Sequence, residues 1–445
     1  MSNNNITSSS SPPLNTSLPV REIPGSYGLP LLGPLTDRLN YSWFQGPETF
    51  FRKRIEKNKS TVFRTNVPPS FPFFVANPNV VAVLDCKSFA HMFDMELVEK
   101  KNILVGDWMP STRFTGDRRV CAYLDTSEPQ HEQLKNFAMD TLKRSSTIWV
   151  PTLTTLLDTM WDTIESELDS GPVSYLVPIQ KFIFAFASIC IAGADPANSS
   201  DIADKGYIRM DRWLALQLLP IVPITVFQPL VEIFLHSFPY PYFLVSRDYN
   251  KLHKFIENEG KEVISRAQTE FKLTSDETGV QEKLRKEVRE KAGSGSGLSL
   301  RSVQEMELVQ SFVYETLRLN PPVPLQYGRA RKDFELSSHD SVFKIKKGEL
   351  LCGFQPLVMR DPKVFDDPET FVPDRFTGEK GKELLTYLYW SNGPQTGMSS
   401  GSNKQCAAKD YVPLTTSLFL AHMFMRYDSV AITNASFTAV DKPTP

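Results

Sequence analysis

One cysteine of this chain stands where its sulfur could act as a metal ligand. Cys406 lies in the loop 403–410, directly ahead of a predicted apolar helix that begins at Tyr411. Backbone N–H groups at the start of that helix would favour thiolate over thiol. A thiolate in such a loop can be the axial ligand of a heme iron. The loop alone leaves a second interpretation open, namely a buried and inert cysteine.

The other cysteines and the charge balance narrow the class of protein. None of the five cysteines forms a C-x-x-C pair, so a disulfide framework is not expected and a reducing compartment is favoured. Basic residues number 49 and acidic residues 51, which gives a net charge of −2 and no basic excess for nucleic acid. The cysteines are Cys86, Cys121, Cys190, Cys352 and Cys406.

Two further motifs could support that loop through an ion network. Glu315 and Arg318 are three residues apart near the end of a predicted helix, so they share a face and can pair. Arg375 follows in a Pro- and Phe-rich loop, and its planar guanidinium suits a bidentate contact with a carboxylate. We expect the three side chains to form a partly buried structural network, although Glu-x-x-Arg pairs usually lie on a solvated surface.

Helices dominate the elements that must position these residues, and the fold class predicted is mainly α with small β-sheets (α+β). Hydroxyl caps and Pro129 mark a helix from about 126 to 142, and a second helix is predicted from about 302 to 319, where Pro321 and Pro322 stop it. Alternating residues predict short strands at 61–65 and 71–75. We expect a polar, disordered tail over 1–20 and a single domain over 21–445.

The segment 214–245 is strongly apolar and contains five prolines, which argue against one continuous membrane-spanning helix. Two interpretations have comparable weight. One is a set of ordinary core helices with a kinked connector. The other is a lipophilic surface that makes peripheral contact with a membrane or admits an oily substrate. With neither a signal peptide nor an anchor in the first residues, a cytoplasmic location with peripheral membrane association is expected.

Taken together and in this order, the three motifs resemble the C-terminal half of cytochromes P-450. Asn-Lys-Gln-Cys-Ala-Ala-Lys-Asp, after a lengthened loop, is similar to the plant branch of allene oxide synthases, hydroperoxide lyases and divinyl ether synthases. The segments 24–30, 109–112 and 123–132 resemble the same branch, and the likeness runs from about residue 19 to 440.

The resemblance implies a cofactor and the residues that hold it. The expected cofactor is heme b, with Cys406 as the axial thiolate and metal ligand. Lys100, His131, Lys135 and Lys404 match positions that contact the heme and its propionates, and propionates at a buried face need cations or donors.

The resemblance also implies a reaction that uses neither dioxygen nor a reductase. The substrate expected is a polyunsaturated fatty-acid hydroperoxide, whose own O–O bond is cleaved. Leu104, expected to be catalytic, matches a position where allene oxide synthases have Phe, although core packing is its simpler interpretation. The likeness is greatest to 9-hydroperoxide-specific divinyl ether synthases. Allene oxide synthase, hydroperoxide lyase, a conventional monooxygenase and an inactive variant remain alternatives.

One departure from the family concerns the far side of the heme. The family has a long apolar helix there, which should lie between Thr274 and Val280, but only five residues separate the two. A helix of about 30 Å needs on the order of 20 residues. We therefore expect this distal helix to be deleted, and the chain to fold poorly or to lack a competent distal pocket.

Overall fold

The computed structural model describes residues 18–67, 77–103, 112–218, 241–260, 278–293, 297–390, 392–433 and 436–442. Its α-helices are α1 Leu32–Leu39, α2 Pro47–Asn58, α3 Cys86–Ala90, α4 Pro129–Ser145, α5 Trp149–Leu168, α6 Leu176–Cys190, α7 Ser200–Leu218, α9 Ser246–Glu259, α11 Thr278–Gly293, α12 Leu300–Gln304, α13 Glu307–Leu319, α14 Gln355–Val358, α15 Gly378–Leu384 and α16 Tyr411–Arg426. Its strands are β1 Val20–Arg21, β2 Val62–Asn66, β3 Asn79–Val83, β4 Val98–Glu99, β5 Val173–Ser174, β6 Leu325–Ala330, β7 Phe334–Ser337, β8 Val342–Ile345, β9 Leu350–Phe354, β10 Ser429–Thr433 and β11 Ser436–Asp441. The predicted fold class, mainly α with small sheets, is confirmed.

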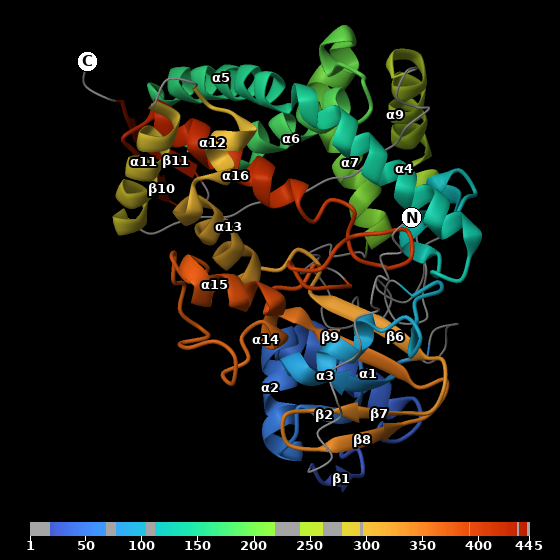
Figure 1. The fold of residues 1–445 in the computed structure, drawn as a ribbon. Helices are drawn as coiled ribbons and strands as arrows, with labels where there is room; N and C mark the ends of the chain where they lie inside the picture. The colour runs from blue at the N-terminus through green and yellow to red at the C-terminus, as the bar shows by residue number, and fades with distance from the viewer. Residues whose placement is uncertain are drawn as a thin grey trace, which may run out of the picture.

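The strands form small sheets beside a larger helical part (Figure 1). A five-stranded sheet has the order β2-β3-β9-β6-β4, with β3 and β9 parallel and the other pairs antiparallel. A second sheet, β1-β8-β7, lies with it at the bottom of the view, near α1 to α3. The third sheet, β10-β11-β5, lies at the upper left beside α5 and α11.

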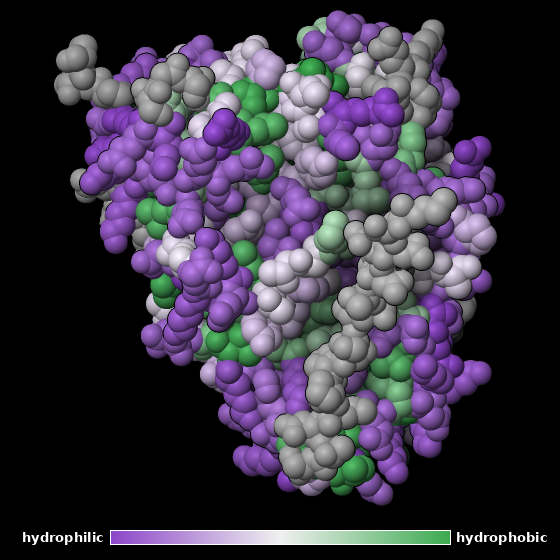
Figure 2. Space-filling view, viewed as in Figure 1, coloured by the Kyte–Doolittle hydropathy of each residue, from purple (hydrophilic) through white to green (hydrophobic). Residues whose placement is uncertain are grey.

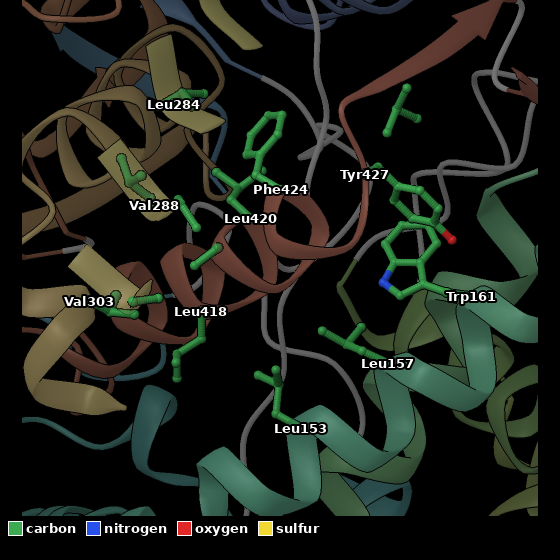
Figure 3. Close-up of a cluster of buried hydrophobic side chains, with 14 of the residues drawn as sticks. Leu153, Leu157, Trp161, Leu284, Val288, Val303, Leu418, Leu420, Phe424 and Tyr427 are labelled. Carbon is green, nitrogen blue, oxygen red and sulfur yellow. The ribbon is translucent and has the colours of Figure 1, made fainter. Parts of the chain in front are cut away.

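The largest helical core forms where α16 lies between α5 and α11 (Figure 3). Leu418 and Phe424 of α16 share this core with Trp161 of α5 and Val288 of α11, and none of these is more than 1% exposed. The rings of Trp161 and Tyr427 cross edge to face, with centroids 5.4 Å apart. This packing fixes α16, and with it the loop that carries Cys406.

Two apolar residues explain why α11 belongs to this core. Leu284 and Val288 are one turn apart and buried, as their spacing predicts.

Most of the face drawn in Figure 2 is hydrophilic, with hydrophobic residues gathered in small separate patches. No described helix is long and apolar enough to cross a membrane.

Several predicted elements differ from the observed ones in detail. The expected helix at 302–319 is two helices, α12 and α13, because the chain turns at Glu305 and Met306. The helix predicted from 126 begins at Pro129, and no side chain caps it, because the Ser127 hydroxyl instead donates to Asp125. Order begins earlier than Arg21, because Val20 already pairs with Val342. The strand predicted at 71–75 lies outside the described residues.

Candidate heme-thiolate site

The loop that carries Cys406 is folded back on itself by its own polar groups. Trp390 N–H donates to the Gly393 carbonyl at 2.7 Å, which closes a tight turn at its start. The Gln405 side-chain amide donates to the Pro394 carbonyl, and a Cβ atom at Gly393 would lie 2.9 Å from the Gln405 side chain. Lys409 donates to the Gln395 carbonyl at 2.9 Å. The stretch 393–397 is thus hydrogen-bonded to Gln405 and Lys409, on either side of the cysteine.

Cys406 itself is partly buried and packs with apolar residues of α4, α5 and α16, among them Leu142, Trp149 and Val412. Burial raises the pKa of the Cys406 thiol, while the Ala408 N–H and the Lys135 charge act in the opposite direction. The expected effect of nearby N–H groups is present in the Ala408 N–H, but in the protein alone burial outweighs it and favours the thiol. A bound metal cation would reverse the balance, since a coordinating thiol is deprotonated outright.

The four side chains expected to bind propionates come together around this loop. Lys135 Nζ donates to the Asn403 carbonyl at 3.0 Å and to that of Gln405, and His131 Nδ1 lies 3.1 Å from the Gly401 carbonyl. Both residues project from α4, as their four-residue spacing predicts.

The remaining two cations bridge to neighbouring segments. Lys404 Nζ donates to the carbonyls of Cys121 and Leu124, at 2.9 and 2.8 Å. Lys100 Nζ donates to the Tyr327 carbonyl of β6 at 2.6 Å. Gly328 makes room for it, since a Cβ atom there would lie 3.3 Å from Lys100 Nζ and overlap Val98.

Burial and mutual repulsion make these cations weaker bases. Burial, followed by the Lys404 charge, lowers the pKa of Lys100 to about 7. Burial and the charges of Lys404 and Lys135 lower the pKa of His131 to about 4. The pKa of Lys404 falls to about 8, chiefly through burial, and that of Lys135 falls for the same reason.

This arrangement fits a dianionic group lying among the four side chains. Lys100, His131 and Lys135 are at most 4% exposed, and all four side chains contact neutral backbone carbonyls. Buried cations held only by neutral acceptors gain much from an anion, because charge-assisted hydrogen bonds are about twice as strong. The donors therefore fit the two propionates that a heme would carry, with Cys406 as the side chain that would bind its iron.

The predicted ion network is present and more deeply buried than expected. Arg318 donates to both carboxylate oxygens of Glu315, at 2.7 and 2.8 Å, and Arg375 Nε lies 3.0 and 3.1 Å from the same oxygens. Glu315 and Arg318 are fully buried, and the Arg375 side chain is 6% exposed. The network ties α13 to the loop 371–376, where Val372 N–H also donates to Glu315.

Some expected features lie outside the described residues, and one set of residues was missed. Leu104 and the residues between Thr274 and Thr278 are among those not described, as is most of the apolar segment 214–245. The missed set is Asp125 with Arg331 and Ser127, which are hydrogen-bonded to one another beside the cation cluster, defined as Lys100, His131, Lys135 and Lys404. The spacing Asp125-Thr126-Ser127, typical of a side-chain-capped turn, was the available signal.

Comparison with known proteins identifies the relatives of the chain. Residues 273–396 match the cytochrome P-450 family. The chain is 62% identical to the chloroplastic fatty acid hydroperoxide lyase of Solanum lycopersicum, over 97% of this chain and 98% of the relative. It is 53% identical to the chloroplastic linolenate hydroperoxide lyase of Arabidopsis thaliana, over 98% and 96%. Identity to the chloroplastic allene oxide synthase of Arabidopsis thaliana is 40%, over 93% and 86%.

The alignments are longer than the part of this chain that they cover. The match to the tomato lyase spans 468 positions, whereas 97% of 445 residues is about 432, so about 36 positions have no counterpart here. The match to the Arabidopsis allene oxide synthase spans 448 positions for about 414 residues of this chain, a difference of about 34. These differences are as long as the expected loss of the distal helix requires. By its high identity to these relatives over nearly its whole length, the chain belongs to the plant cytochrome P-450 branch of fatty-acid hydroperoxide lyases and allene oxide synthases.

Proposed function

We propose that this chain is a heme-thiolate lyase that cleaves polyunsaturated fatty-acid hydroperoxides, without dioxygen or a reductase. The observation that carries the proposal is the partly buried Cys406 loop, surrounded by three lysines and His131 whose described hydrogen bonds go to neutral carbonyls, in a chain 62% identical to a hydroperoxide lyase. A bound ferric heme would supply homolytic cleavage of the hydroperoxide O–O bond.

The residues of the chain divide the remaining work. Cys406 would bind the iron of heme b through its thiolate, and Lys100, His131, Lys135 and Lys404 would hold its propionates. The apolar packing around Cys406 excludes water from the sulfur, and the Ala408 N–H donates to that sulfur. Glu315, Arg318 and Arg375 hold the loop 371–376 against α13.

Product analysis tests this proposal against the other outcomes of the same chemistry. Purified chain is given 9- and 13-hydroperoxides of linoleic and linolenic acids, and the products are separated by mass spectrometry. Short-chain aldehydes with their oxo-acid partners support the lyase. A divinyl ether, which the sequence favoured, or an allene oxide recovered as its ketol would replace the lyase by that activity. The tomato and Arabidopsis relatives that are 62% and 53% identical are both named as lyases, and this is our reason for preferring cleavage.

A second candidate function is a heme-binding chain without turnover. About 36 positions of the tomato lyase have no counterpart here, and residues 260–277 are all that connect α9 to α11. The ferrous–CO spectrum separates the two. A heme-thiolate band with full hydroperoxide turnover would refute the loss of a competent distal pocket, whereas the same band without turnover would support it.

We also infer peripheral membrane contact through the apolar segment 214–245. Its described end is unusually exposed for apolar residues, with Phe243 at 73% and Leu244 at 49%. Co-sedimentation with lipid vesicles should fall when both are changed to Ser, and equal binding of the variant would refute the inference.

The chloroplastic names of the relatives weigh against the expected cytoplasmic location, and a fluorescent fusion imaged in leaf cells decides between the two.

A further inference from the structure

The turn that precedes α4 ends at a fully buried carboxylate, that of Asp125. Its Oδ1 accepts the Lys100 N–H at 2.8 Å. Its Oδ2 accepts Arg331 Nη2 at 2.6 Å, and both the N–H and the hydroxyl of Ser127, at 3.0 and 2.7 Å. One side chain therefore joins three separate parts of the chain: the end of β4, the residue that follows β6, and the start of α4.

Arg331 gives this junction a second anchor. Its Nε donates to the Met95 carbonyl and its backbone N–H donates to the Leu97 carbonyl, both at 2.8 Å. The hydrogen bonds of Arg331, Lys100 and Ser127 outweigh the effect of burial and hold the pKa of Asp125 well below its usual range. The carboxylate is thus ionised at any pH at which the protein works.

The same turn also binds one lysine of the cation cluster, Lys404. Lys404 lies on the distant cysteine loop, and its ammonium group donates to the carbonyls of Cys121, Ala122 and Leu124. These carbonyls converge only because the chain turns just ahead of Asp125. Lys100 is fixed directly, since its own backbone N–H is bound to the carboxylate.

Asp125 also supplies negative charge to the cluster without occupying its donors. Its charge raises the pKa of Lys100, His131 and Lys404, against the lowering caused by burial and by the neighbouring cations. Among the described hydrogen bonds, none joins Asp125 to the ammonium group of Lys100 or of Lys404; these groups donate to neutral carbonyls, which a bound anion would replace.

We propose that Asp125 is the positioning residue of the cofactor site: its carboxylate fixes the turn and the backbone that aim Lys100 and Lys404 at the propionates of the heme. The proposal rests on the heme-binding function proposed above. It assigns Asp125 no contact with the cofactor itself.

The test compares Asp125→Asn with the unchanged full-length chain, prepared without cofactor. The amide keeps the shape but loses the charge, and its NH2 group cannot accept from the donors that face one of the two carboxylate oxygens. Titration with hemin, followed by absorbance, should show an affinity about 10- to 100-fold weaker, the usual effect of changing a residue that orients the groups in contact with a cofactor. The same titration is run with the dimethyl ester of hemin, which has no propionate charge. The preference of the chain for hemin over the ester should shrink in the variant.

Asp85→Asn is the matched control. Asp85 is 2% exposed and its carboxylate is also held by backbone and hydroxyl donors, at 2.8 and 2.9 Å from Ser88, but it caps α3. Both variants should lower the unfolding temperature. The hemin-over-ester preference should fall for Asp125→Asn alone, and an equal fall in both would reduce Asp125 to a general structural residue and overturn the proposal.

A measurement without cofactor separates this proposal from the one it rests on. Brief acylation with acetic anhydride, read by mass spectrometry, should label Lys404 several-fold faster in Asp125→Asn than in the parent chain, while labelling of the exposed Lys286 stays unchanged. Failure of the parent chain to bind hemin would refute the heme-binding function. Unchanged labelling of Lys404 together with unchanged hemin affinity would refute the role of Asp125.

Discussion

Replacing Glu315 by Gln should unfold the chain far more easily than any exposed substitution of the same kind. The carboxylate accepts five hydrogen bonds, two from Arg318, two from Arg375 and one from Val372 N–H. The amide keeps the volume but removes the charge, and its NH2 group faces guanidinium donors. Two arginines are then left in a buried site without a counter-charge.

The expected loss follows from that burial. Breaking a buried ion pair by removing one partner costs about 3–5 kcal/mol, because the remaining charge stays desolvated. Here one carboxylate serves two guanidinium groups, so we expect the upper part of that range. A domain of ordinary stability has about 5–15 kcal/mol in total, so the change removes a large share of it.

Urea unfolding of the cofactor-free chain, followed by tryptophan fluorescence and by far-ultraviolet circular dichroism, measures the loss. The control is Glu305→Gln, whose carboxylate lies 3.3 Å from Arg301 with side chains 53% and 91% exposed. That exposed pair should change the free energy of unfolding by less than about 0.5 kcal/mol. A loss below about 1 kcal/mol for Glu315→Gln would show that the network does not stabilise the contact between α13 and the loop 371–376.

Three further changes probe the core, the ligand and the cations. Leu418→Ala should cost about 2–5 kcal/mol, because Leu418 is fully buried between α5 and α11, whereas Leu134→Ala, 41% exposed, should cost little; thermal unfolding of both variants decides. Cys406→Ser should abolish the heme-thiolate band of the ferrous–CO spectrum while Cys190→Ser keeps it, and a normal band in Cys406→Ser would reject Cys406 as the ligand. The pKa of Lys100 is about 7 in the folded chain and 10.5 in an exposed lysine, so between these values the unfolded chain binds more protons. The free energy of unfolding of the cofactor-free protein should therefore rise with pH in this range, by at most about 1.4 kcal/mol per pH unit. Lys100→Met should flatten that rise, and an unaltered slope would place the titration elsewhere.

Local sequence patterns predicted what depends on neighbouring residues, and failed where distant segments decide. The four-residue spacing of His131 and Lys135 put both on one face of α4, and the stripe at Leu284 and Val288 gave the buried face of α11. The break between α12 and α13 was not predicted, because no glycine or proline marks it.

The candidate site shows the same division more sharply. The resemblance to a known family, and not spacing, placed Lys100 and Lys404 near each other, since 304 positions separate them in the chain. Asp125 was not predicted because its role depends on hydrogen bonds with Lys100 and Arg331, and the sequence pattern around Asp125 does not show that these residues lie beside it. The effect of nearby N–H groups on Cys406 was predicted, but burial, which the sequence does not display, outweighs it.

The carbonyl contacts of the four cations have a consequence for how the protein acquires its cofactor. Each ammonium or imidazole group already has a neutral oxygen partner, so the folded chain does not need the heme to satisfy these groups. When heme binds, its propionates would replace the backbone carbonyls as hydrogen-bond acceptors of these side chains. Each replacement of a neutral acceptor by a charged one stabilises the complex by about 1 kcal/mol. Synthesis of the polypeptide and delivery of the heme can therefore be separate events, with a folded, cofactor-free pool between them.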